Sequence, residues 1–241
     1  MFDKFLSYLK FEKRYSAHTI NAYQRDLNDF LEYAEIEKVG DFENLSASYI
    51  RSWIVFLIEK GLKNRSVNRK LASLRSFYKW LMKEEIVYSS PMSKVNGPKS
   101  EKHLPQFVQE SELDLSKLEK LFSNDFEGKR DALMFELFYQ TGIRLSELIG
   151  LRLEDLQPAN IKVLGKRNKE RIIPISNKLY IRAQEYLTLR QEQGPDSAHL
   201  LILDSGKKLY PAFAYRKINS YLGNITTLDK RSPHVLRHTF A

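Results

Sequence analysis

Four basic residues in three separate segments could together bind a phosphate group. Arg144 follows a Thr-Gly pair, Lys166 lies in a strongly charged turn, and His234 and Arg237 lie three residues apart near the end of the sequence. A guanidinium can donate two parallel hydrogen bonds to a phosphate, and a histidine exchanges protons near neutral pH. Preorganised cations of this kind stabilise an anion whose charge grows during a reaction. These residue types therefore indicate a site for a reacting phosphate, provided that folding brings the three segments together.

Thr141-Gly142 is predicted to end one helix, and another helix is predicted to follow it. In that second helix Arg144 and Glu147 lie three residues apart, so their side chains share one face. Glu147 can orient the guanidinium of Arg144, and the backbone N–H groups at the helix start also favour an anion. An ordinary ion pair within a helix explains the same spacing. Taken by itself, the pair favours that simpler explanation.

His234 and Arg237 repeat the spacing in a helix predicted to begin after Ser232, with Pro233 as its first residue. His234 and His238 lie four residues apart, as metal ligands often do, but no glutamate lies between them as in the His-Glu-x-x-His pattern. We therefore expect no metal ion and no cofactor. A capped surface helix with incidental charges is the alternative.

A β-hairpin is predicted where two β-rich runs, residues 161–164 and 171–175, flank a charged turn. The turn region offers four cations, namely Lys166, Arg167, Lys169 and Arg171. An ammonium on such a tip could enter a DNA groove and protonate a leaving oxygen. Attraction of phosphates without any catalysis is the alternative.

Helical spacing of apolar residues predicts the elements that must position these groups. Residues 1–90 are expected to form a four-helix bundle, and residues 111–241 a second domain of helices around the hairpin. Prolines and glycine between the two predict an interdomain linker over residues 91–110. The predicted fold class is therefore mainly α with a small β-hairpin or sheet. The expected N-caps in the bundle are Ser16, then Ser46 or Ser48, then Ser66.

The last predicted helix of the bundle is basic on one face. Residues 60–83 contain eight Lys or Arg and no Asp or Glu. At helical spacing, five of these cations fall within a sector about 120° wide, opposite the apolar residues. These five, called the basic stripe below, are Arg65, Arg69, Arg75, Lys79 and Lys83. Solvated surface charges usually alternate with acids, so their absence favours contact with a DNA backbone over a plain surface face.

Composition supports a polyanionic partner and excludes several classes of chemistry. The net charge is +9, although many ordinary proteins are also basic. The sequence has no cysteine, which excludes disulfides, thiolate nucleophiles and cysteine zinc sites. No apolar run is long enough to span a bilayer and no signal peptide is recognisable, so a cytoplasmic, nucleoid-associated protein without a membrane partner is expected.

Taken together, these motifs resemble the tyrosine recombinases, most closely the Xer-type bacterial enzymes and related integrases. The matching stretches in the second half are residues 139–148 (YQTGIRLSEL), 165–175 (GKRNKERIIPI) and 233–241 (PHVLRHTFA). Residues 16–23 (SAHTINAY) and 65–71 (RSVNRKL) are similar to that family's SAM-like DNA-binding domain. The resemblance covers essentially the whole chain, and the ordered set of motifs is highly specific.

The resemblance implies a C-shaped clamp around double-stranded DNA that cleaves and rejoins strands without metal or ATP. In the family a tyrosine attacks the scissile phosphate, forms a 3′-phosphotyrosyl link and frees a 5′-hydroxyl. By position, Arg144 and Arg237 would hold the nonbridging oxygens, Lys166 would be the general acid, His234 would assist proton transfer, and Glu147 would support the site. The resemblance and the basic stripe together give the residues expected to contact DNA, which are Ser16, Thr19, Tyr23, Arg65, Ser66, Asn68, Arg69, Lys70, Arg75, Lys79 and Lys169.

Two departures from the family pattern matter. Arg167 replaces the glycine common after the hairpin lysine, so Lys169 is the alternative to Lys166. The nucleophilic tyrosine of the family lies a few dozen residues beyond residues 233–241, so we expect this 241-residue chain to bind DNA without cleaving it, as a catalytic domain incomplete at its C-terminus. The full-length form is expected to assemble as a tetramer on two DNA sites. The alternative function is a noncatalytic DNA-binding protein on the same fold, and an RNA- or partner-binding helical protein is a more distant one.

Overall fold

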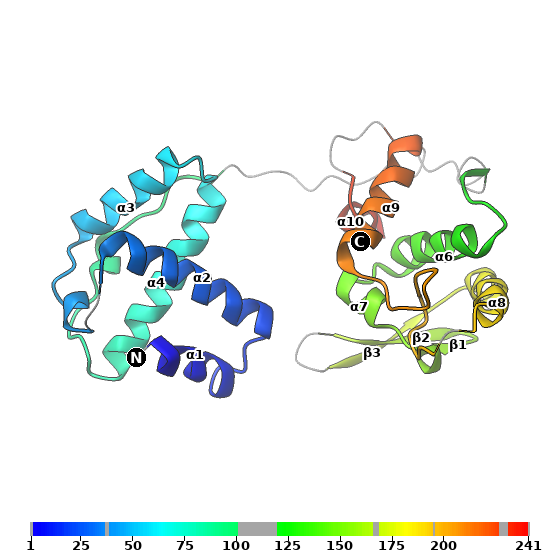
Figure 1. Ribbon diagram of the computed structural model, residues 1–241, viewed down its shortest axis with the longest axis horizontal. Coiled ribbons are helices and arrows are strands. Elements are labelled where there is room, and N and C mark those ends of the chain that lie inside the picture. The colour runs from blue at the N-terminus through cyan, green and yellow to red at the C-terminus, as the bar shows by residue number, and fades with distance from the viewer. Residues whose placement is uncertain are drawn as a thin grey trace. The chain divides into compact units, whose positions relative to one another are not determined.

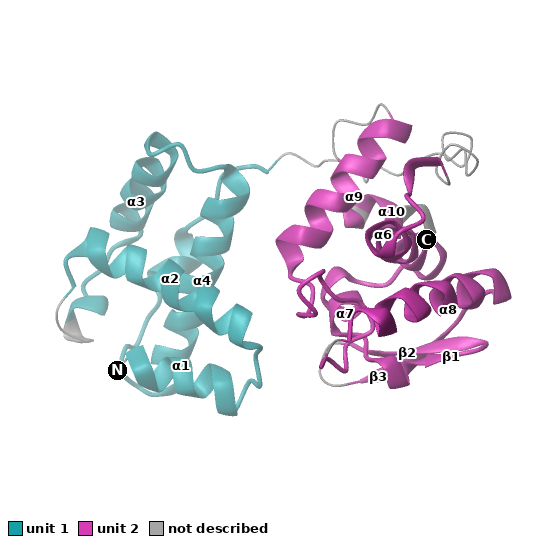
Figure 2. Ribbon diagram, turned by 45° about the vertical axis from the view of Figure 1, so that its right-hand side comes forward, with its two compact units in different colours: residues 1–102 teal, residues 103–241 magenta. Residues whose placement is uncertain are grey.

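The computed structural model describes residues 2–36, 39–100, 120–165, 169–194, 196–226 and 231–240. Within these ranges, the side chains of residues 39, 40, 234 and 238–240 are not described. The chain divides into two compact units, residues 1–102 and 103–241, which Figure 2 shows in teal and magenta. The described part is mainly helical with one three-stranded antiparallel sheet, as the sequence predicts. None of its helices is long and apolar enough to cross a membrane.

The described residues of the first unit form four α-helices and two short 3₁₀ helices. Figure 1 shows the four α-helices. Two of the predicted caps are present, because Ser16 accepts a hydrogen bond from Thr19 N and Ser46 accepts one from Tyr49 N. Ser66 does not cap the fourth helix, which begins two residues earlier after Lys63 without a side-chain cap. The bounds are α1 Phe2–Phe11, α2 Ala17–Ala34, η1 Val39–Phe42, α3 Ala47–Glu59, α4 Asn64–Lys83 and η2 Pro91–Lys94.

Aromatic rings fill the core of the first unit. Phe5 of α1 lies 5.0 Å from Phe77 of α4, measured between ring centroids, and Phe30 of α2 lies 4.8 Å from Trp53 of α3. Such edge-on ring pairs stabilise a core beyond the area that they bury. The four helices are therefore held to one another by a shared apolar interior.

The first unit extends beyond residue 90, where the sequence placed its end. Met92 and Val95 are buried in its core, and Asn68 of α4 donates hydrogen bonds to Pro98 O at 2.8 Å and Ser100 Oγ at 2.9 Å. Prolines in this stretch stop regular helix but do not prevent an extended chain from packing on α4. Residues 91–100 therefore belong to the first unit, and the rest of the expected linker lies outside the described residues.

The second unit surrounds the buried helix α6 (Figure 1). Helices α7, α8, α9 and α10 all pack against α6, and α7 also packs against the middle strand β2. The strands follow the order β1-β2-β3, with Val163 of β2 opposite Arg171 of β3. The bounds are α6 Phe126–Thr141, α7 Leu145–Gly150, η4 Leu153–Asp155, β1 Leu156–Gln157, β2 Asn160–Leu164, β3 Glu170–Pro174, α8 Asn177–Glu192, α9 Pro211–Ile225 and α10 Pro233–Phe240.

Gly142 sets the direction in which the chain leaves α6. It adopts φ +55°, in the left-handed region that glycine enters without steric cost, and its N–H donates to Phe138 O at 3.1 Å. The chain then turns at once into α7. The predicted helix end at Thr141-Gly142 is thus confirmed, and Arg144 comes to stand at the N-cap position of α7.

Candidate functional site

Arg144 is joined to Glu147 by two hydrogen bonds at the start of α7. The Arg144 backbone N–H donates to Glu147 Oε2 at 2.8 Å, and its guanidinium Nη1 donates to Glu147 Oε1 at 2.7 Å. The Glu147 side chain is 4% exposed and the Arg144 side chain is 40% exposed. The spacing in the sequence predicted this pair. The Glu147 carboxylate is buried, while the Arg144 guanidinium keeps further N–H donors that can bind an external anion.

Arg171 of β3 also binds Glu147, a contact that the sequence did not predict. Its Nη1 and Nη2 donate to the two carboxylate oxygens at 2.8 and 2.7 Å. Burial by itself would raise the pKa of Glu147, but the hydrogen bonds from Arg171 and Arg144 lower it to about 2. Glu147 is therefore ionised at neutral pH and acts as a fixed anion between two cations. In the sequence Arg171 was only one of four cations around the hairpin turn. The available signal was its spacing two residues before Ile173, which places both on the half-buried face of β3.

Arg237 reaches the same region from the last helix. Its Nη1 donates to the Gly142 carbonyl, two residues before Arg144, and the buried Val235 and Leu236 pack α10 against α6. Arg144 and Arg237 lie far apart in the sequence but both lie at the loop between α6 and α7. We call Arg144, Arg171 and Arg237, with Glu147 between the first two, the cation cluster.

The remaining predicted members of the site fall partly outside the described residues. Lys166 and the neighbouring Arg167 lie outside them, and of His234 only the backbone, in the first turn of α10, is described. The residues on either side of the hairpin turn are described: Gly165 N donates to Lys169 O at 2.8 Å, and Lys169 is exposed. A side chain at Gly165 would meet Arg171 Nη1 at 3.3 Å and Glu147 Oε1 at 3.7 Å. The residue immediately before Lys166 therefore lies against the cation cluster.

In the first unit, a buried carboxylate organises part of the basic stripe. Asp26 of α2 is 1% exposed and accepts hydrogen bonds from Arg69 and from Ser73, the latter at 2.8 Å. Half of the Arg69 side chain remains exposed, so its guanidinium is held at one end and free at the other. A guanidinium held in this way loses less side-chain entropy when it binds a phosphate.

Lys70 does not lie where the resemblance implied. It is 5% exposed and forms ion pairs with Asp26 and Asp29, because its position on α4 faces α2 and not solvent. Asn68 is likewise engaged with Pro98 and Ser100. These two side chains hold the first unit together, and we omit them from the proposed DNA interface.

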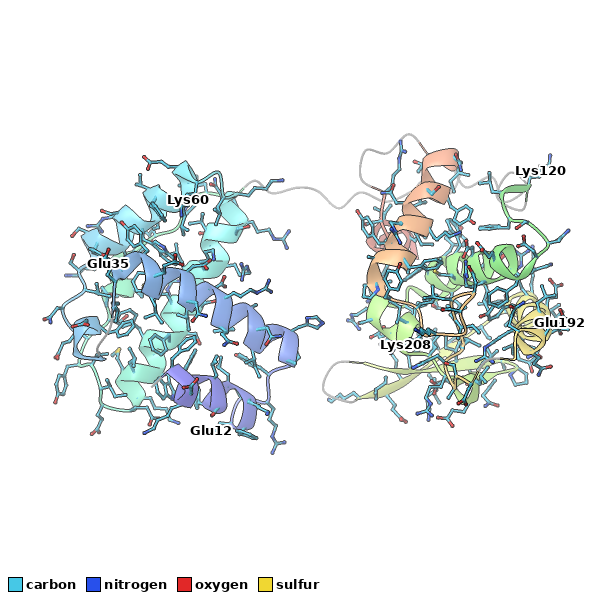
Figure 3. All side chains as sticks on the ribbon, viewed as in Figure 1. Glu12, Glu35, Lys60, Lys120, Glu192 and Lys208 are labelled. Carbon is cyan, nitrogen blue, oxygen red and sulfur yellow. The ribbon has the colours of Figure 1, made fainter. Side chains whose placement is uncertain are left out.

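The other stripe residues differ in how free they are. Arg75 donates to Val95 O at 3.3 Å, and Lys83 pairs at 3.2 Å with Glu12 at the end of α1, which is labelled in Figure 3. Arg65 and Lys79 are exposed and have no partner among the described residues. Arg65 and Lys79 are therefore the best placed of the stripe to bind an external polyanion.

Three predicted DNA-contacting residues lie together in the first turns of α2. The Ser16 and Thr19 hydroxyls are hydrogen-bonded at 2.9 Å, and the Tyr23 ring lies 6.0 Å from that of Tyr15, measured between centroids. Burial raises the pKa of Tyr23, so its hydroxyl stays protonated at neutral pH. Hydroxyl groups and backbone donors at a helix start are typical phosphate contacts. Ser66, in the first turn of α4, is half-buried.

Comparisons with known proteins match both units. Residues 2–85 match the family described as phage integrase, N-terminal SAM-like domain, and residues 109–241 match the phage integrase family. The chain is 38% identical to "Tyrosine recombinase XerC" of Thermodesulfovibrio yellowstonii, covering 98% of this chain and 80% of that protein. It is 37% identical to the protein of that name from Staphylococcus carnosus, covering 99% of this chain and 81% of that protein.

A solved structure has the same fold. The XerH site-specific recombinase bound to palindromic difH substrate superposes with a TM-score of 0.78 at 20% identity, covering 99% of this chain and 71% of that chain. The family assignment rests on the sequence matches. The superposition shows in addition that the backbone fold is similar. The chain belongs to the tyrosine recombinase, or phage integrase, family and is similar to XerC proteins.

Proposed function

We propose that the protein serves site-specific DNA strand exchange through a 3′-phosphotyrosyl intermediate, and that residues 1–241 alone bind duplex DNA without cleaving it. The observation that carries the proposal is the cation cluster, in which Arg144 and Arg237 come from different helices to one loop. A phosphodiester gains negative charge as it becomes pentacoordinate, and guanidinium groups fixed in advance stabilise that charge.

The proposed step breaks one P–O bond and forms another. A tyrosine oxygen attacks phosphorus while Arg144 and Arg237 bind the two nonbridging oxygens. Lys166, or Lys169 in its place, gives a proton to the departing 5′-oxygen, and His234 assists the proton transfer. The freed 5′-hydroxyl later attacks a phosphotyrosine in a second strand, which restores the tyrosine and joins the strands.

These 241 residues do not supply the nucleophile. No tyrosine follows Tyr221, and the family resemblance places the attacking tyrosine beyond the His234 and Arg237 segment. The chain spans about 80% of the XerC relatives that it matches, which agrees with a further segment in those proteins. Residues 1–241 are therefore expected to hold a scissile phosphate without attacking it.

Relatives supply the proposed assembly. Solved structures include XerH bound to difH substrate and a lambda integrase tetramer bound to a Holliday junction. We infer the same arrangement here: four subunits on two DNA sites, with residues of the basic stripe along the phosphate backbone. A protein that works on such sites would be found at the nucleoid.

The function is tested by joining the C-terminal segment of the Staphylococcus carnosus relative to residue 241. Residues 1–241 should shift labelled duplex carrying the recombination site without forming a covalent product. The extended chain should trap a nicked duplex as a protein–DNA adduct that survives denaturation and resists EDTA. Specific binding by both chains with no adduct from the extended one would favour the noncatalytic DNA-binding alternative. Adduct formation that EDTA abolishes would contradict the proposed chemistry.

Arg65→Ala and Lys79→Ala are each expected to weaken duplex binding roughly fivefold at about 0.1 M salt and to lower the slope of log K against log salt by about 1. The reason is that each exposed cation, when bound to a phosphate, releases one counterion. Fluorescence anisotropy across a salt series measures both quantities. Lys10→Ala on α1 removes the same charge elsewhere in the unit and is the matched control. If all three variants behave alike, the basic stripe does not contact DNA.

A further inference from the structure

Arg171 binds a carboxylate through both terminal nitrogens of its guanidinium. Among the described contacts of the cation cluster, this is the one bidentate arginine–carboxylate pair. The two nitrogens bind the two oxygens of Glu147 at 2.8 and 2.7 Å, and that carboxylate is almost fully buried. Parallel hydrogen bonds of this kind fix both the distance and the orientation of the two groups. Because Glu147 belongs to α7 and Arg171 to β3, the contact fixes a strand relative to a helix.

The position of Arg171 within the hairpin makes this contact important for the turn. Arg171 lies opposite Val163, and the next pair in register, Leu164 with Glu170, is the last before the turn. Gly165 follows directly and lies so close to Arg171 and Glu147 that a side chain there would touch both. Lys166 is the next residue. The hairpin is thus held at its base, directly before Lys166 in the sequence.

The same contact decides how much positive charge Arg144 can offer. Glu147 carries one negative charge and touches two guanidinium groups, so the three side chains keep a net charge of about +1. Without Arg171, a buried carboxylate would face Arg144 alone and draw its donors inward, because an uncompensated buried charge is costly. Arg144 would then compete poorly for a phosphate.

We propose that Arg171 is a positioning residue for strand cleavage: through Glu147 it fixes the base of the β2–β3 hairpin to α7, and so holds Arg144 in place for the scissile phosphate. This inference rests on the proposed function for its consequence in catalysis, but the attachment of the hairpin to α7 stands on the contacts alone. The neighbouring ion pair between Lys162 and Glu170, at 3.6 Å with both side chains about half exposed or more, offers a control in the same hairpin.

The attachment is tested without DNA or catalysis. The sequence has no cysteine, so Ser146→Cys and Lys169→Cys place two nitroxide labels on exposed positions of α7 and the hairpin turn. Double electron–electron resonance then gives the distribution of distances between them. Arg171→Gln should broaden and shift this distribution. Arg171→Lys should give an intermediate result, because lysine keeps the charge but cannot form the second hydrogen bond to Glu147. Lys162→Gln should leave the distribution unchanged. Circular dichroism verifies that the helices are retained in each variant.

The catalytic consequence is tested in the extended chain without labels. Arg171→Gln should slow adduct formation about 10- to 100-fold while duplex affinity stays within about twofold, since displacement of a reacting group by about 1 Å has a cost of that size. Arg171→Lys should recover part of the rate, and Lys162→Gln should match the parent. An unaltered distance distribution in Arg171→Gln overturns the proposal, as does an unaltered rate. Failure of the parent extended chain to form adduct would count against the proposed function. The distance distribution between the two labels would still decide whether Arg171 attaches the hairpin to α7.

Discussion

Arg144→Ala is expected to lower the rate of covalent adduct formation by the extended chain about a thousandfold or more, with duplex affinity nearly unchanged. In the proposed step the guanidinium stabilises the pentacoordinate phosphate, where charge is greatest, and it should contribute little to the binding of a duplex held along many phosphates. The α7 start should survive the change, because the backbone N–H of residue 144 donates to Glu147 and Arg171 still binds that carboxylate. Single-turnover trapping on a nicked duplex measures the rate, and anisotropy measures the affinity.

Two further variants make this result specific. Arg152→Ala removes an arginine eight residues later whose side chain is about half exposed and pairs with Glu154, and it should retain the parent rate. Arg144→Lys keeps a positive charge but loses the planar pair of donors, so it should recover only a small part of the rate. Adduct formation by Arg144→Ala at close to the parent rate would remove Arg144 from the proposed site.

Asp131→Ala is expected to destabilise the second unit by about 3–5 kcal/mol, because it breaks a buried group of charges. Asp131 is fully buried and accepts from Arg130 Nε, Tyr221 Oη and Lys217 Nζ, each at 2.9 Å. Arg130 is also fully buried and, among the described carboxylates, would keep its ion pairs with Asp204 and Glu127 alone. The group joins α6 to α9, the helix that precedes α10, so its loss would also loosen the attachment that brings Arg237 to Gly142.

The two units can be followed separately in this experiment. Both tryptophans of the chain, Trp53 and Trp80, lie in the first unit, so fluorescence reports that unit while far-ultraviolet circular dichroism reports both. The unfolding transition of the second unit is the one that circular dichroism detects and tryptophan fluorescence does not. Asp131→Ala should lower the Tm of that transition by roughly 10 °C or more. Lys129→Ala, which removes a partly exposed pair with Glu185, should change stability by about 1 kcal/mol or less. Equal transitions in the two variants would contradict the argument.

Local features of this chain could be predicted from the sequence because their partners are close in the chain. The caps at Ser16 and Ser46, the turn at Gly142 and the pairing of Arg144 with Glu147 each join residues three or four positions apart. Two β-rich runs around a charged turn likewise predicted the pair of strands β2 and β3. Where the local signal was ambiguous the prediction failed. Asn64 and Ser66 are both acceptable caps by residue type, but the helix begins at Asn64 after Lys63, so neither of them caps it.

Contacts between distant residues were decided by the tertiary structure. Arg171 meets Glu147 across 24 positions, Lys70 meets Asp26 across 44, and Arg237 meets Gly142 across 95. A charge pattern in the sequence shows which side chains could pair, but many different pairings fit the same pattern. The packing of α4 on α2, of β3 near α7 and of α10 on α6 selects the pairs that form. The sequence by itself therefore determined the residue types, the elements and the family resemblance. The fold decided which cations pair with the protein's own carboxylates and which remain free to bind a phosphate. Burial and distance make this choice because they set the energy of every charge pair.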